Sequence, residues 1–138
     1  MLGEFHHLGV ACRDLDAEEQ AWSIMGYTRE GIDFEDPIQR VRGRFIVGPG
    51  PRLELLMPLS SGSPLDNVLR KGIKIYHQAY LTEQFDSTVE MLTARRFRLV
   101  GAPAPAVAFE GNRIAFFALP NLAIIEIIEA QPSSASSA

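Results

Sequence analysis

Three features are scarce in this sequence. Cys12 is the only cysteine, which excludes an intrachain disulfide and a zinc site made of several cysteines. Lys and Arg are scattered, and 17 acidic against 13 basic residues give a net charge of −4, which argues against a nucleic acid partner. The longest apolar run, 122–128, is too short to cross a bilayer and contains an acid, and no basic segment leads into an apolar stretch at the N-terminus. We therefore expect a cytoplasmic protein with no membrane partner.

The chain contains enough apolar residues to form a hydrophobic core. At 138 residues and 46% hydrophobic composition, it matches the size of one compact domain. We expect that domain over residues 1–130. The remainder, 131–138 (QPSSASSA), lacks large apolar side chains, so we expect a disordered tail.

The apolar segments occur twice in the same order. FHHLGVAC opens the first half and RLELLMP closes it, while KIYHQAYL opens the second half and AIIEIIEA closes it. Helical spacing of apolar residues predicts helices at about 15–25 and 82–95, and a shorter helix at 64–70 links the halves. Asp14 can cap the first helix. Both halves therefore read β, α, β, β, β, which predicts an α+β fold with repeat one at about 4–60 and repeat two at about 72–130.

Polar residues interrupt the apolar strands at matching places in the two halves. Glu126 stands within Ile-Ile-Glu-Ile-Ile, and Glu54 is flanked by leucines. Because side chains alternate across a strand, both faces of these strands are apolar, and an ionised carboxylate without a partner there is very costly. His7 and His77 open the two halves.

A local two-fold relation between the halves would bring these four residues together. Two imidazoles and two carboxylates suit a divalent ion such as Zn, Ni, Co, Mn or Fe. Each residue alone is more often a hydrogen-bonded core residue, but their joint placement predicts a metal site formed by His7, Glu54, His77 and Glu126. His6 should point to the opposite face from His7 and have a structural role, unless a bulge in the strand exchanges the roles of the two.

The motifs also carry a family resemblance. HLGVACRDLDAEEQAW, LELLMPL followed by SPL, IYHQAYL, GNRIAFF and LAIIEIIE resemble, in order, the signatures of methylmalonyl-CoA epimerase-like proteins in the vicinal oxygen chelate (glyoxalase/bleomycin resistance/dioxygenase) superfamily. The resemblance covers residues 5–130. It implies two βαβββ modules in a cupped eight-stranded mixed sheet, a homodimer, and metal ligands at the four residues named above.

The sequence departs from the family at one functional position. Epimerases of this type have a second carboxylate in a Pro-Glu-Gln-like segment, and here that segment reads DPIQ (36–39), with Ile38 in place of the glutamate. Inversion at a carbon acid requires proton removal from one face and delivery to the other. Glu35, Asp36 and Glu110 are the candidates to supply the second acid, and each is alternatively a solvated loop residue.

The resemblance implies a metal-dependent isomerase or lyase, epimerase-like or glyoxalase-like, that transfers a proton next to a carbonyl. We expect Glu126 to be the base and a small acyl thioester to be the substrate. An Fe(II) dioxygenase is the first alternative, which Glu54 disfavours because it fills a position that O₂ chemistry leaves open. A non-catalytic small-molecule binding protein is the second.

Two further segments have alternative interpretations. Arg40, Arg42 and Arg44 alternate along a strand and would share one face, either meeting an anionic group of a ligand or solubilising an exposed strand. The Pro-rich segment 103–109 either covers the mouth of the cavity or is a passive connection.

Overall fold

The computed structural model describes residues 2–131, and its elements follow the predicted β, α, β, β, β order twice. Residues 132–138 of the expected disordered tail lie outside the described residues. The first module comprises β1 (Phe5–Ala11), α1 (Leu15–Ser23), β2 (Thr28–Asp36), β3 (Val41–Val47) and β4 (Leu53–Pro58). After α2 (Leu65–Arg70), the second comprises β5 (Ile75–Thr82), α3 (Phe85–Ala94), β6 (Arg98–Pro105), η1 (Val107–Phe109), β7 (Arg113–Ala118) and β8 (Ile124–Glu129).

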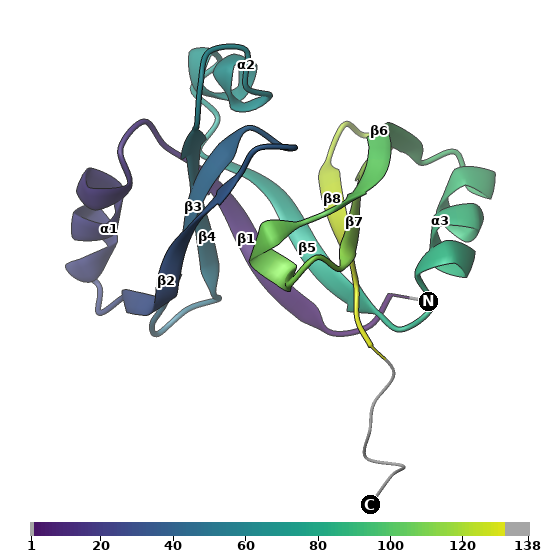
Figure 1. Cartoon of the computed structure of the whole chain (residues 1–138), viewed down its shortest axis with the longest axis horizontal. Coiled ribbons are helices and arrows are strands. Elements are labelled where there is room, and N and C mark those ends of the chain that lie inside the picture. Colours follow the sequence, from purple (N-terminus) through teal and green to yellow (C-terminus); the bar gives the residue numbers. More distant parts are fainter. Residues whose placement is uncertain (1, 132–138) are drawn as a thin grey trace, which may run out of the picture.

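The eight strands form one mixed sheet in the order β2-β3-β4-β1-β5-β8-β7-β6. β1 and β5 pair antiparallel at its centre, and each pairs in parallel with the last strand of its own module, β4 or β8. The two halves of the sheet rise on either side of β1 and β5 like the walls of a cup, with α1 and α3 on the outside (Figure 1). The predicted cupped eight-stranded mixed sheet is confirmed.

The helices begin and end close to the predicted positions. The Asp14 side chain accepts a hydrogen bond from the Ala17 backbone N–H at 3.0 Å, which confirms the predicted N-cap of α1. α1 ends at Ser23, three residues before Gly26, whose φ of 98° belongs to the left-handed region. α3 occupies the inner part of the predicted range 82–95. Among the described residues, no helix combines the length and apolar character needed to cross a bilayer.

Apolar residues on the outer sheet face pack against apolar residues of α1 or α3 and form a separate core in each module. The core beneath α1 includes Val10, Leu15, Ile46, Leu53 and Leu55. The core beneath α3 includes Phe85, Leu92, Phe117, Ile125 and Ile127. Because strand side chains alternate, the neighbours of these residues face the inside of the cup. Glu54 and Glu126 are such neighbours, so the outer cores determine which way the two acids point.

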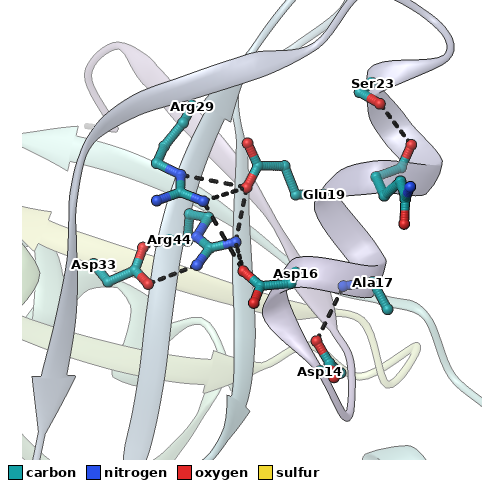
Figure 2. Close-up of polar contacts among 9 residues, drawn as sticks. Asp14, Asp16, Ala17, Glu19, Ser23, Arg29, Asp33 and Arg44 are labelled. Atoms are coloured by element: carbon teal, nitrogen blue, oxygen red, sulfur yellow. Dashed lines mark hydrogen bonds and ion pairs between the residues drawn. The ribbon is translucent and has the colours of Figure 1, made fainter.

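α1 is attached to the sheet by a buried arginine as well as by its apolar core (Figure 2). The Arg44 side chain on β3 is only 5% exposed and donates to both carboxylate oxygens of Asp33, at 2.7 Å each. Its remaining nitrogen, Nη1, donates to Asp16 at 2.9 Å and to Glu19 at 2.7 Å, both on α1. The Arg44 guanidinium in turn lowers the pKa of Asp33. The acids of α1 thus compensate a buried cation.

The expectation that Arg40, Arg42 and Arg44 form one exposed or ligand-facing row is wrong. Arg40 precedes β3, and its φ of 57° places it in the turn. Arg42 is exposed, whereas Arg44 is buried under α1 on the outer side of the sheet. The row is broken because the strand begins one residue after Arg40 and the acidic helix covers Arg44.

Candidate metal centre

The four predicted ligands converge inside the cup, one from each of the four central strands. His7 comes from β1, Glu54 from β4, His77 from β5 and Glu126 from β8, and one potential ligand atom of each lies within 4.8 Å of the others. All four are buried, with exposures of 0%, 5%, 2% and 2%. The sequence prediction that these residues meet therefore agrees with the geometry.

Strand register and one glycine make this convergence possible. Gly9 is paired with Glu54 on one side and with His77 on the other. A Cβ atom on Gly9 would lie 2.0 Å from His77 Cε1 and 2.5 Å from its Nε2, so the imidazole occupies space that any other residue would fill. Gly9 has no polar group that would mark it as a site residue in the sequence, although a glycine inside a strand commonly indicates such a close approach.

The distances among the potential ligand atoms fit a single metal ion. His7 Nε2 lies 3.0 Å from Glu54 Oε1, 3.2 Å from Glu126 Oε1 and 3.1 Å from His77 Nε2. His77 Nε2 lies 3.1 Å from Glu126 Oε1 and 3.7 Å from Glu54 Oε1. Ligands bonded at about 2.0–2.2 Å around a tetrahedral ion are separated by about 3.3–3.6 Å. Glu126 Oε1 is also buried, with the Nε2 atoms of both histidines as its neighbours, as suits an atom that binds a cation.

Without a cation, the imidazoles compensate the carboxylates. Burial lowers the pKa of His7, but the negative charges of Glu54 and Glu126 outweigh burial and raise it to about 9. Burial raises the pKa of Glu54, but the two histidines outweigh that effect and lower it to about 2. The same partners raise the pKa of His77 and lower that of Glu126. A metal ion bound here would replace imidazole protons.

His6 does not lie where strand alternation predicts. A register shift between Phe5 and His7 forms a bulge in β1, and His6 Nδ1 approaches His7 Nδ1 to 2.8 Å. The expectation that His6 points away from His7 is therefore wrong, because a bulge breaks the two-residue period.

A cavity of about 570 Å³ opens onto Glu54 and Glu126. This volume lies within the range of small-molecule sites, about 300–1,000 Å³. Its walls come from both modules and are mainly apolar, with Phe34, Leu56, Val68, Ala104, Ile114 and Phe116 among them. None of its described lining residues is Lys or Arg. An anionic group of a ligand inside the cavity would therefore meet positive charge only at a bound metal.

The three candidates for a second acid lie in different environments. Glu35 and Glu110 do not line the cavity, and Glu35 is 58% exposed beside Arg42. Asp36 lines the cavity, but its carboxylate accepts hydrogen bonds from three backbone N–H groups, those of Ile38, Gln39 and Val107, and from the Gln39 side chain. Its acceptor capacity is used in holding the turn after β2. Ile38 itself lines the cavity.

The segment 103–109 forms part of the cavity wall through Ala104, Ala106, Ala108 and Phe109. The Phe109 ring stacks on His7, with centroids 6.0 Å apart and planes inclined by 13°. The Val107 backbone N–H donates to Asp36, which ties this segment of the second module to the first. The segment is therefore a structural wall of the site as well as a connection.

Comparison with known proteins agrees with this architecture. The model of the glyoxalase/bleomycin resistance protein/dioxygenase superfamily matches residues 6–116. The ethylmalonyl-CoA/methylmalonyl-CoA epimerase of Cereibacter sphaeroides is 28% identical over 118 residues, which cover 84% of this chain and 88% of that protein.

Solved structures show the same fold. The methylmalonyl-CoA epimerase of Mycobacterium tuberculosis is 23% identical, with a TM-score of 0.79 over 99% of this chain and 93% of that one. A variant of the Streptomyces coelicolor methylmalonyl-CoA epimerase in complex with 2-nitronate-propionyl-CoA is 22% identical, with a TM-score of 0.80 over 96% of this chain and 100% of that one. By its family match and its fold, this chain belongs to the glyoxalase/bleomycin resistance protein/dioxygenase superfamily.

Proposed function

We propose that this protein binds a divalent metal ion through His7, Glu54, His77 and Glu126 and transfers a proton at the carbon next to the carbonyl of a small acyl thioester. The observation that carries the proposal is the convergence of these four buried side chains beside a largely apolar cavity. The similarity to epimerases that act on ethylmalonyl-CoA and methylmalonyl-CoA supports the choice of substrate class.

The bound cation would supply Lewis-acid stabilisation of the negative charge that develops on the carbonyl oxygen. The chain's own contribution begins with His7 and His77, which hold the centre from the two middle strands. Glu126 is the base that takes the proton from the α-carbon, because it lines the cavity beside the candidate metal centre. The apolar walls exclude water, which strengthens the electrostatic interactions in the site.

We expect the acids available in the cavity to lie on one side of a bound substrate. Of its described lining residues, Glu54 and Glu126 are the carboxylates whose acceptor capacity is not used by backbone N–H groups, and both belong to the ligand set. Ile38 stands where a second acid would be needed for inversion. Glu126 therefore returns the proton to the face from which it was removed, and exchange with solvent is faster than inversion.

The experiment is incubation of the metal-loaded protein with methylmalonyl-CoA and related α-substituted acyl thioesters in D₂O. We expect deuterium at the α-carbon with the wild-type protein and at least about a 100-fold slower exchange with Glu126→Gln. Glu110→Gln removes an exposed acid outside the cavity and serves as the matched control, with exchange unchanged.

The outcomes distinguish the proposal from its alternatives. Full exchange by Glu126→Gln would show that Glu126 is not the base. Absence of exchange with every thioester, in protein that contains stoichiometric metal, would favour a small-molecule binding role. Consumption of O₂ by the iron-loaded protein would favour a dioxygenase, although four protein ligands leave fewer positions for O₂ than such chemistry uses.

A further inference from the structure

The two histidines of the proposed metal centre differ in their surroundings. His7 Nε2 faces the other three potential ligands, while its second ring nitrogen, Nδ1, lies 2.8 Å from Nδ1 of His6. His77 also directs Nε2 inward, but its Nδ1 has no hydrogen bond among the described residues. Of the two histidines, His7 is thus the one with a hydrogen-bonding partner on the side away from the centre, within the part of the chain that the structure describes.

The contact between adjacent histidines depends on the bulge in β1. In a regular strand, neighbouring side chains point to opposite faces, so their rings cannot meet. The register shift between Phe5 and His7 brings the two rings to a centroid distance of 5.1 Å. The bulge thus places the His6 imidazole beside the His7 ring, on the side away from the candidate metal centre.

The His6 ring is held in this position from several sides. Its centroid lies 5.8 Å from that of Phe45 and 5.3 Å from that of Phe109, both in edge-to-face orientation. The His6 backbone carbonyl accepts a hydrogen bond from Arg52 Nη1 at 2.9 Å. A ring confined in this way is a well-placed acceptor rather than a freely rotating surface side chain.

The chemistry of a metal-binding imidazole assigns a role to this acceptor. A neutral histidine that offers the lone pair of Nε2 to a cation carries its proton on Nδ1. Metal-binding histidines usually donate that second N–H to a carboxylate, a backbone carbonyl or water, which fixes the tautomer and the orientation of the ring. Here the group at that position is the imidazole nitrogen of the preceding residue.

We propose that His6 is a positioning residue, which accepts the Nδ1–H of His7 and holds His7 in the tautomer and orientation that present Nε2 to the metal ion. This inference rests on the proposed metal centre. It makes the pair His6-His7 a single unit, in which the first residue orients and the second binds.

Two substitutions separate hydrogen bonding from packing. His6→Phe keeps an aromatic ring between Phe45 and Phe109 but removes the acceptor. His6→Asn loses the ring but keeps an acceptor, because Asn Oδ1 is as many bonds from the backbone as His Nδ1. We expect His6→Phe to bind Zn²⁺ about 10–100-fold more weakly than the wild type, and His6→Asn to recover most of that loss. Competition with a chromophoric chelator measures both affinities.

Nuclear magnetic resonance of ¹⁵N-histidine-labelled, Zn²⁺-loaded protein supplies a readout independent of affinity and activity. In the wild type, we expect a slowly exchanging Nδ1–H signal from His7, assigned by its loss in His7→Ala. The signal should disappear or exchange rapidly in His6→Phe and persist in His6→Asn.

Three results would contradict the role of His6, the proposed metal centre or both. If His6→Phe binds Zn²⁺ as tightly as the wild type and keeps the protected proton, the role of His6 is overturned while the metal centre stands. If both variants lose Zn²⁺ affinity equally although their far-ultraviolet circular dichroism is native, the loss of the hydrogen-bond acceptor does not explain the weaker binding. If the wild type itself binds no Zn²⁺, Ni²⁺, Co²⁺ or Mn²⁺, the metal centre and the inference fail together.

Discussion

Gly9 connects the backbone of β1 directly to the geometry of the candidate metal centre. It lies between Glu54 and His77 in the sheet, and the His77 ring fills the space above it. The role of this glycine is spatial: the absent side chain leaves room for a ligand.

Gly9→Ala should therefore displace the His77 imidazole. The added methyl would come within 2.0 Å of the ring, and no flexible chain end is available to yield. We expect Zn²⁺ affinity to fall at least about tenfold, as measured by chelator competition. Gly31→Ala is the control, because that glycine has no neighbour within 4 Å and only a positive φ, so stability falls slightly and metal affinity does not. Equal metal affinity of Gly9→Ala and wild type would contradict this account of the glycine.

In the proposed reaction, Ile38 should decide the stereochemical course. It lines the cavity, and the resemblance of residues 36–39 to the epimerase segment implies an acid at this position. We expect Ile38→Glu to raise the rate of inversion relative to deuterium exchange by at least about tenfold, since a second proton carrier then faces the substrate. Ile38→Gln, which adds polarity without an acid, should leave the ratio unchanged. Chiral analysis of the thioester during exchange in D₂O gives both rates.

At the scale of elements, the attachment of α1 depends on charge compensation as well as apolar contact. α1 buries only Leu15 fully, while Arg44 joins the helix to β2 and β3 through Asp16, Glu19 and Asp33. The apolar face of α1 is narrow, so the ion pairs between the buried guanidinium and the three carboxylates contribute to holding the helix on the sheet.

Arg44→Met should reduce the free energy of unfolding by about 2–4 kcal/mol, because it leaves three acids close together without their shared cation. Arg29→Met is the matched control. Arg29 also pairs with Glu19, but its side chain is 45% exposed, so its removal should cost about 1 kcal/mol or less. Urea unfolding of both variants measures the difference. Similar losses for the two arginines would show that burial of Arg44 is unimportant.

On the scale of the whole molecule, the proposed metal ion joins the two modules. His7 and Glu54 belong to the first module and His77 and Glu126 to the second, so a bound ion crosslinks β4, β1, β5 and β8. Metal binding should stabilise the folded chain, with about 2.7 kcal/mol expected at a free metal concentration of 100 times the Kd.

That stabilisation should depend on pH in a defined direction. In the metal-free protein, the pKa of His7 is raised to about 9, above its unfolded value of about 6.5. Protonated His7 therefore stabilises the folded, metal-free protein fully below pH 6.5, and this contribution is lost as the pH rises through 9. Below pH 9, metal must displace this proton, and apparent affinity should rise from pH 6 to 9. Thermal unfolding with and without Zn²⁺, together with titration calorimetry in buffers of different ionisation enthalpy, tests this. Affinity that is flat over this range would contradict it.

The homodimer, the cytoplasmic location and the extent of the domain over residues 1–130 stay predictions. Size-exclusion chromatography with light scattering would test the first. The apolar side chains that remain exposed in the described single chain, such as Ile24, Ile32 and Leu122, are the surfaces to compare with any dimer contact.

The amino-acid sequence alone determined the repeat, the order of the elements and the four potential ligands. Each of these follows from local periodicity, or from a charged side chain in an apolar strand that must find compensation. The register of β1 was decided only in the folded sheet, where a bulge turns His6 toward His7 and Gly9 makes room for His77. The sequence pattern likewise places Arg44 in an exposed or ligand-facing row, whereas in the folded protein α1 covers it. Such contacts join residues distant in the chain, and strand periodicity carries no information about which strands pair or where a register shifts.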